Sequence, residues 1–381
     1  MSAPTRIIAE AGVNHDGSEE RAMALVDAAA DAGADTVKFQ TFDPDALVSA
    51  SAPQAAYQTQ NTGRTESQRA MLSRLVLSHA AHARIQAHCQ QRGIGFLSTP
   101  FDLASLEFLV DTLRLTELKI GSGDLTNAPL LLRAAQHGTR LILSTGMATL
   151  DDIEAALGVV AFGYRALLAE APSGVAPGRV AFSSAFAEAF EKGDTTLGRV
   201  VRERVSLLHC TSAYPAPMAS LHLRAMDTMA ARFPLAVGYS DHSLGLTAVI
   251  AAVARGARVV EKHLTLDSTL PGPDHAASLD PTTFRALVAA VRDTEAALGD
   301  PQKSVQPTER DVRHVARKSL FTRRAVRTGE PFSEESLTTR RPGTGITAMD
   351  YFDWIGTPSP SDLADDTMIP PTTDADAGRT A

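Results

Sequence analysis

The chain has 381 residues, of which 44% are hydrophobic and 21% are charged, and its formal net charge is -8 at pH 7. This length suits one large domain followed by a small one, and the acidic balance argues against broad affinity for nucleic acid. The two cysteines form no CxxC motif, which argues against a disulfide framework or a cysteine zinc site and suits a reducing compartment. Because the N-terminus lacks a signal-peptide apolar run and no stretch is long enough to span a membrane, we expect a cytoplasmic protein with no membrane partner.

The first helix shows a pattern that recurs along the chain. After a short apolar run at residues 6–9 comes Ser18, a residue type that caps helix N-termini, with acidic residues in the following turn. Gly33 is suited to end the helix. The i, i+3, i+4, i+7 spacing that predicts one buried helix face is kept by Ala22, Leu25, Val26 and Ala29.

Short β-prone runs alternate with helical patterns over most of the chain. Eight such runs are expected to be strands, at residues 6–9, 36–39, 95–97, 117–120, 141–144, 205–209, 236–239 and 259–263. Eight strands that alternate with helices favour a closed parallel (β/α)₈ TIM barrel over an open doubly wound sheet. We therefore predict an α/β fold with a catalytic TIM-barrel domain at residues 1–300.

Two long stretches interrupt this alternation. Residues 43–66 are polar and follow the second predicted strand, and residues 162–204 precede the sixth. The second stretch holds a Pro/Gly segment and a possible helix at residues 185–191. Long loops on a barrel are often lids or subunit contacts, but each stretch can equally be an insertion on the outer surface.

The pattern changes near residue 301. Residues 301–317 are polar and are expected to be a linker. Residues 318–369 are dense in turn residues with short β-prone runs, which predicts a small, mostly β second domain. Residues 370–381 form a polar tail that we expect to be disordered.

Polar residues follow every predicted strand at the end where a TIM barrel carries its active site. Two lysines and several hydroxyls can together hold a phosphate and a carboxylate. These residues are Lys38, Thr99, Lys119, Ser122, Ser144 and Ser240. A lysine at this position can alternatively form an imine with a carbonyl substrate, as in an aldolase.

Two histidines end neighbouring predicted strands. Strands in a sheet lie about 5 Å apart, so His242 and His263 can both reach one divalent ion. His209 and His275 remain possible ligands at this stage. Glu10 is a candidate acid/base or substrate-binding carboxylate, or a salt-bridge partner for one of the lysines.

The chain closely resembles the bacterial sialic acid synthase (N-acetylneuraminate synthase) family. The resemblance rests on the segments IIAEAGVNHDGS, GADTVKFQT, FLSTPFD, KIGSGD, ILSTGMATLDDIEAAL, LLHCTSAYPAP, VGYSDHSLG, VEKHLTLD and GPDHAAS. In the second predicted domain it rests on RKSLFTRRAVRTGEPFSEESLTTRRPGTGI, which resembles the family's antifreeze-like (SAF) domain. It covers nearly the whole chain except residues 162–204 and the tail.

The resemblance implies a set of site residues. It implies that phosphoenolpyruvate is held by Lys38, Thr99, Lys119, Ser122, Ser144, Ser212 and Ser240. It implies that Glu10 is the catalytic carboxylate, and that His242 and His263 bind a divalent metal, most often Mn²⁺. Contacts to an N-acylated hexosamine are implied for Gln40, Tyr214, Glu261, Asp274 and Arg341. Ser212 stands where some relatives have Asn, so its contact with phosphoenolpyruvate is expected to be shorter or water-mediated.

The resemblance also implies a domain-swapped homodimer, in which the SAF domain caps the partner's barrel and brings Arg341 to the partner's sugar site. The expected reaction is that of an N-acetylneuraminate synthase, a transferase that condenses phosphoenolpyruvate with N-acetylmannosamine. The alternative within the family is an N,N'-diacetyllegionaminate or pseudaminate synthase acting on a 2,4-diacetamido-6-deoxy hexose. The segment at residues 52–71 resembles both kinds of synthase and does not separate them. A Schiff-base aldolase and a carbohydrate-binding protein are the remote alternatives.

Overall fold

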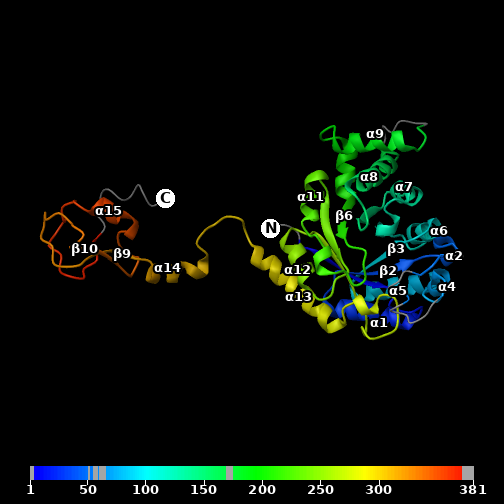
Figure 1. Cartoon of the computed structure of the whole chain (residues 1–381), viewed down its shortest axis with the longest axis horizontal. Helices are drawn as coiled ribbons and strands as arrows, with labels where there is room; N and C mark the ends of the chain where they lie inside the picture. The colour runs from blue at the N-terminus through cyan, green and yellow to red at the C-terminus, as the bar shows by residue number, and fades with distance from the viewer. Residues whose placement is uncertain (1–3, 50–51, 55–58, 60–65, 169–174, 371–381) are drawn as a thin grey trace. The chain divides into compact units, whose positions relative to one another are not determined.

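The computed structural model describes residues 4–49, 52–54, 59, 66–168 and 175–370. The chain divides into two compact units, Met1–Gly299 and Asp300–Ala381 (Figure 1). Apart from its first residue, the tail predicted at residues 370–381 lies outside the described part. Among the described residues no helix is both long and apolar enough to cross a membrane.

The first unit is a barrel of parallel strands, which confirms the predicted (β/α)₈ class. The strands are β1 (Arg6–Gly12), β2 (Thr36–Thr41), β3 (Gly95–Pro100), β4 (Glu117–Ile120), β5 (Arg140–Ser144), β6 (Val205–Cys210), β7 (Ala236–Asp241) and β8 (Val259–His263). Their order in the sheet is β3-β2-β1-β8-β7-β6-β5-β4, and β3 also contacts β4, so the sheet closes on itself. Each predicted strand coincides with an observed one to within three residues at either end.

Helices follow the strands and form the outer layer (Figure 1). They are α1 (Glu19–Ala32), α2 (Pro44–Leu47), α4 (Gln68–Ser73), α5 (His79–Arg92), α6 (Leu103–Glu107), α7 (Ala128–Gln136), α8 (Leu150–Arg165), α11 (Ala225–Arg232), α12 (Thr247–Ala254) and α13 (Pro281–Leu298). Helix α1 begins and ends as predicted: the Ser18 hydroxyl accepts from the Arg21 amide, and Gly33 takes a left-handed φ of 84°. The predicted apolar face of α1 is buried.

The barrel has two separate apolar layers because successive strand residues point to opposite faces. The interior is filled by Ile8, Leu97, Ile142, Leu208 and Val259. Residues of the other parity, such as Ile7 on β1 and Tyr239 on β7, belong to the larger core between the strands and the helices. This alternation decides which strand residues can face the mouth of the barrel.

The stretch predicted at residues 162–204 forms helices α9 (Arg179–Phe190) and α10 (Thr196–Arg204), which pack on α8. The rings of Phe162 and Phe182 meet edge to face at 5.4 Å, and Gly158 of α8 lies against the α9 backbone. Phe186 extends the contact to Phe233, the residue after α11. The described part of this insertion therefore thickens the outer helical layer, which is the second of the two alternatives weighed from the sequence.

The second unit has a core of its own. It contains α14 (Arg310–Ala316), the antiparallel pair β9 (Ser319–Thr322) and β10 (Leu337–Arg340), and α15 (Tyr351–Trp354). Leu320, Phe332 and Ile369 are among the residues of its buried cluster. Isolated β-bridges connect the turns between these elements. Part of the segment expected to be a linker is thus helical, because residues 310–316 form α14.

Candidate active site

The polar residues of the site form the next inward-facing layer after the apolar residues of the barrel interior, toward the carboxyl ends of the strands. Glu10, Thr99, Ser144, Cys210 and Glu261 each stand two residues after one of the five interior apolar residues and share their inward direction. They line a cavity of about 560 Å³ at the carboxyl ends of the strands. Every site residue predicted in the first unit lines this cavity: Glu10, Lys38, Gln40, Thr99, Lys119, Ser122, Ser144, Ser212, Tyr214, Ser240, His242, Glu261, His263 and Asp274.

Arg341 is the one predicted site residue outside this cavity, because it belongs to the second unit. It is exposed there and precedes Pro342 across a cis peptide bond. Its approach to a sugar bound in a partner's barrel stays a prediction.

Two lysines and two carboxylates form a buried network on the cavity floor. Lys38 Nζ lies 2.7 Å from Glu10 Oε2 and 3.7 Å from Glu261 Oε1, and it donates to Thr99 Oγ1 at 3.2 Å. Lys119 Nζ lies 3.3 Å from Glu261 Oε1, which also accepts from Ser240 Oγ at 3.2 Å. The salt-bridge role considered for Glu10 is therefore present, and it does not exclude a catalytic role.

Burial sets the protonation of this network. It raises the pKa of Glu10 to about 7, because loss of water outweighs the attraction of Lys38. Burial alone would raise the pKa of Glu261 too, but Lys119 and Lys38 outweigh it and lower that pKa. Burial lowers the pKa of Lys119, whereas for Lys38 the two carboxylates overcome burial and raise the pKa. Glu10 is thus the member of the network that can gain or lose a proton near neutral pH.

Hydroxyls and a backbone amide surround the other side of the floor. Ser122 Oγ accepts from the Gly146 amide at 3.0 Å. A Cβ on Gly146 would collide with Ser212 Oγ and stand 2.8 Å from Ser122 Oγ, so the backbone comes very close to both hydroxyls. Ser144 Oγ is buried and has no hydrogen-bond partner among the described residues. Such a group of donors beside two lysines can bind an oxyanion.

The two predicted metal histidines meet above this floor. The ring centroids of His242 and His263 are 5.4 Å apart, and the Tyr214 ring lies 4.1 Å from that of His242. His242 Nδ1 lies 2.9 Å from the Thr211 carbonyl oxygen, so this nitrogen carries a proton and donates to that oxygen. Burial alone would lower the pKa of His242, but its contact with Cys210 outweighs burial and raises that pKa, so the other nitrogen offers a lone pair only when the ring is neutral. Burial, followed by the positive charges of His242 and Lys38, lowers the pKa of His263 well below its usual range and keeps it neutral.

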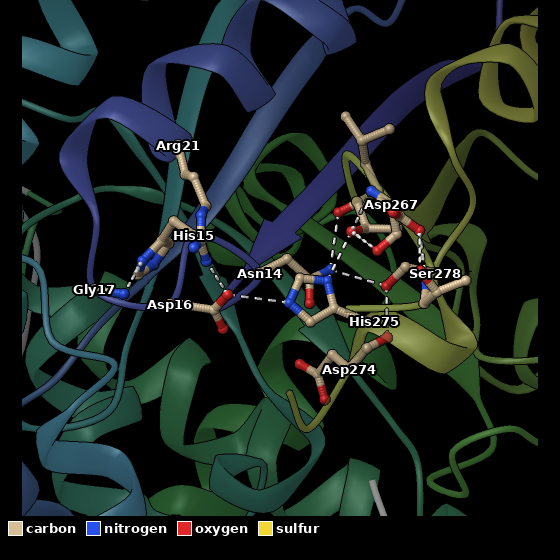
Figure 2. Close-up of polar contacts among 12 residues, drawn as sticks. Asn14, His15, Asp16, Gly17, Arg21, Asp267, Asp274, His275 and Ser278 are labelled. Carbon is tan, nitrogen blue, oxygen red and sulfur yellow. Dashed lines mark hydrogen bonds and ion pairs between the residues drawn. The ribbon is translucent and has the colours of Figure 1, made fainter. Parts of the chain in front are cut away.

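A polar network holds the loop that carries Asp274 (Figure 2). Asn14 Nδ2 donates to Ser278 Oγ at 2.9 Å, and Ser278 Oγ donates to the Asp274 carbonyl oxygen at 2.6 Å. His275 is occupied in this network, since its Nδ1 lies 2.7 Å from Thr265 Oγ1 and its Nε2 faces Asp16. Asn14 and His275 therefore fasten the loop that follows β1 to the loop that follows β8 and carries Asp274.

His209, the other histidine left open as a ligand, has its Nε2 2.7 Å from the Leu221 carbonyl oxygen and does not line the cavity. It lies on the outward-facing parity of β6, between the inward residues Leu208 and Cys210. Neither His209 nor His275 is placed to join His242 and His263.

Sequence reasoning missed several cavity residues. Cys210 lines the floor, and its Sγ lies 3.6 Å from His242 Nδ1. The signal for it was its parity, two residues after the apolar Leu208. Met71 and Leu75, an i, i+4 pair from α4 and the residues just after it, form an apolar wall. No local pattern separates such a pair from ordinary core residues.

Comparison with known proteins identifies the family. Residues 25–303 match the NeuB family. The chain belongs to this family. It is 40% identical to the N,N'-diacetyllegionaminic acid synthase of Campylobacter jejuni, over 96% of this chain and 98% of that one. It is also 40% identical to the synthase of the same name from Legionella pneumophila, over 92% and 89%.

A solved structure agrees with this membership. The N-acetylneuraminic acid synthetase of Leptospira borgpetersenii superposes with a TM-score of 0.62 at 29% identity, and covers 81% of this chain and 90% of that one. The family resemblance inferred from the sequence motifs is therefore confirmed, and this NeuB-family chain is an enzyme of the transferase class. The two relatives at 40% identity carry the name of the synthase that the sequence analysis kept as the alternative within the family.

Proposed function

We propose that the enzyme is an N,N'-diacetyllegionaminate synthase. It condenses phosphoenolpyruvate with a 2,4-diacetamido-6-deoxy hexose and releases phosphate. The observation that carries the choice of sugar is the 40% identity, over nearly the full length, to two proteins of that name, against 29% to an N-acetylneuraminic acid synthetase. The cavity supports the chemistry, because lysines, hydroxyls and two imidazoles line it together at the carboxyl ends of the barrel strands.

The donor set suits a divalent ion such as Mn²⁺. His263 Nδ1 is buried and finds no hydrogen-bond partner among the described residues, and it lies 4.0 Å from Asp274 Oδ2. Within the described ranges no group of three or more His, Cys, Asp or Glu side chains converges to hold an ion. Two histidines would therefore leave most coordination positions to water and substrate oxygens. When bound, the ion supplies Lewis-acid polarisation of the sugar's carbonyl oxygen.

The chain's own residues position phosphoenolpyruvate. Lys38 and Lys119 offset the negative charge of its phosphate and carboxylate, and Ser122, Ser144 and Ser212 supply hydroxyl donors. Held in this way, its C3 methylene carbon forms the new bond to the sugar's C1. Water then adds at C2, and phosphate leaves with cleavage of its C–O bond.

Glu10 handles the protons of this sequence. With a pKa of about 7 it is populated in both protonation states at neutral pH, which is the condition for efficient general acid–base catalysis. It delivers a proton to the developing sugar hydroxyl or accepts one from the attacking water. Gln40 Nε2 lies 3.3 Å from Glu10 Oε1 and orients the carboxyl group.

Phosphate release from phosphoenolpyruvate tests the proposal. With Mn²⁺ present, we expect turnover with the 2,4-diacetamido-6-deoxy hexose to exceed turnover with N-acetylmannosamine, and EDTA to abolish both. A preference for N-acetylmannosamine would make the enzyme an N-acetylneuraminate synthase. Release that persists after complete metal removal would contradict the metal assignment. Borohydride trapping of a lysine with pyruvate would instead point to the aldolase alternative.

We further propose the domain-swapped dimer, with Arg341 of one chain reaching the partner's sugar. A mixing experiment tests it. Glu10→Gln and Arg341→Ala are each expected to be inactive alone. After subunit exchange, one barrel in each mixed dimer has its own Glu10 and the partner subunit's Arg341, so activity should reappear. No recovery in demonstrated mixed dimers would place Arg341 in its own chain's site or outside any site.

A further inference from the structure

A buried ion pair lies behind the two metal histidines, on the outer face of the barrel. Lys262 Nζ of β8 is 2.6 Å from Asp241 Oδ2 of β7, and both side chains are fully excluded from solvent. The two residues are direct neighbours in the parallel β7–β8 register. Each precedes one of the histidines in sequence, so the strand alternation points the ion pair outward and the imidazoles toward the cavity.

This pair also holds the backbone that follows His242. Asp241 Oδ1 accepts from the Ser243 amide at 2.9 Å and from the Tyr239 hydroxyl at 3.1 Å. Lys262 Nζ donates in addition to the Ser243 carbonyl oxygen. Both polar groups of the Ser243 backbone are thus fixed, and the backbone of His242 is constrained on either side.

Stability alone is a weak reason for this arrangement. Removing an ammonium and a carboxylate from water costs free energy that their attraction often fails to recover, and apolar replacements of buried ion pairs are frequently neutral or stabilising. Asp241 and Lys262 do not line the cavity, so they have no direct contact with a substrate there. The role that fits the geometry of the ion pair is therefore to position the two imidazoles.

We propose that Asp241 and Lys262 are positioning residues for the metal site. By locking the β7 terminus to β8, they hold His242 and His263 at a separation at which both rings face one ion. This inference rests on the metal assignment in the proposed function. It assigns a role to a pair on the far side of the barrel wall, which acts through the backbone and not through a hydrogen bond to either imidazole.

The test uses a charge-free pair in the full-length protein. Asp241→Asn with Lys262→Met removes both charges together, keeps an acceptor for the Ser243 amide and the Tyr239 hydroxyl, and leaves the Ser243 carbonyl without its donor. A single Lys262→Met would bury an unpaired carboxylate and confuse misfolding with the effect sought. We expect the affinity for Mn²⁺ to weaken about 10- to 100-fold. Titration calorimetry and the electron spin resonance of free Mn²⁺ measure this affinity.

Two further measurements separate positioning from general damage. Phosphoenolpyruvate affinity measured without metal should stay at the wild-type value, because Lys38 and Lys119 are untouched. The matched control is Leu131→Ala, a buried truncation on α7 that should lower stability and leave Mn²⁺ affinity unchanged. If the double variant does not fold, Tyr239→Phe replaces it as the test. This substitution removes one hydrogen bond to Asp241 with little change in volume and should weaken Mn²⁺ binding roughly five-fold.

The outcomes are distinguishable. Wild-type Mn²⁺ affinity in the folded double variant, or in Tyr239→Phe where the double variant does not fold, would overturn the positioning role and leave the proposed function intact. A wild-type protein whose Mn²⁺ binding is absent, or is unaffected by His242→Ala, would overturn the metal assignment itself and with it this inference. Loss of Mn²⁺ affinity in the double variant with unchanged phosphoenolpyruvate affinity supports the inference.

Discussion

Replacing Glu10 with Gln should make the folded barrel less sensitive to rising pH. Glu10 is 2% exposed, and burial raises its pKa from 4.5 to about 7. The folded state therefore holds the proton more tightly than the unfolded state does. Any stability that comes from the protonated carboxyl is fully present below pH 4.5 and is lost as the pH rises through 7. Gln imitates the protonated form at every pH and removes this loss.

The size of the effect follows from the shift. A displacement from 4.5 to about 7, at 1.36 kcal/mol for each pKa unit, corresponds to about 3 kcal/mol at high pH. Most of this falls between pH 5 and pH 8, where the stability of Glu10→Gln relative to wild type should rise by about 2–3 kcal/mol. The same variant should lose turnover, because it cannot exchange a proton.

Urea unfolding at several pH values measures this difference. Circular dichroism follows the helices of the barrel, whereas the fluorescence of Trp354, the only tryptophan, reports the second unit. A chelator keeps metal out of the site. The exposed Glu191→Gln is the matched control and should track wild type at all pH values. A constant difference between Glu10→Gln and wild type from pH 5 to pH 8 would refute the reasoning.

Three other substitutions test the site and the barrel. Lys119→Met should raise the KM for phosphoenolpyruvate about 10- to 100-fold, because the variant loses a charged contact with this substrate. The KM is measured by phosphate release, and an unchanged value would exclude Lys119 from the anion site. Gly238→Ala should lower the free energy of unfolding by about 1–3 kcal/mol, because its Cβ would collide with the Val259 carbonyl and stand 2.7 Å from Leu208 Cδ2. An unchanged midpoint of urea unfolding would argue against this close approach. Phe186→Ala should cost about 3–5 kcal/mol of stability by urea unfolding and leave kcat at its wild-type value, whereas a changed kcat would connect the insertion with the sugar site.

Local periodicity explains why so much of the barrel was predictable. Helix α1 was recognisable from its cap, its apolar spacing and Gly33, all of which lie within one short segment. The strands were recognisable from short β-prone runs, and the rule that barrel enzymes work at the carboxyl ends of strands identified the cavity residues. The sequence could not decide between two acylated sugars, because that choice depends on distances to substituents and not on the identity of the floor residues.

By itself, then, the sequence determined the barrel, the placement of polar residues at the carboxyl ends of its strands, and the family, since each depends on neighbours close in the chain or on ordered motifs. Only the tertiary structure decided which charges meet. Lys119 and Glu261 are 142 positions apart, and their contact exists because strand register and barrel closure bring them to one level. Strand register likewise places Lys262 against Asp241. Hydrogen bonds to the Leu221 carbonyl and to Thr265 hold His209 and His275 away from the two histidines proposed to bind metal. No local pattern carries that information, because it belongs to the packing of the whole barrel.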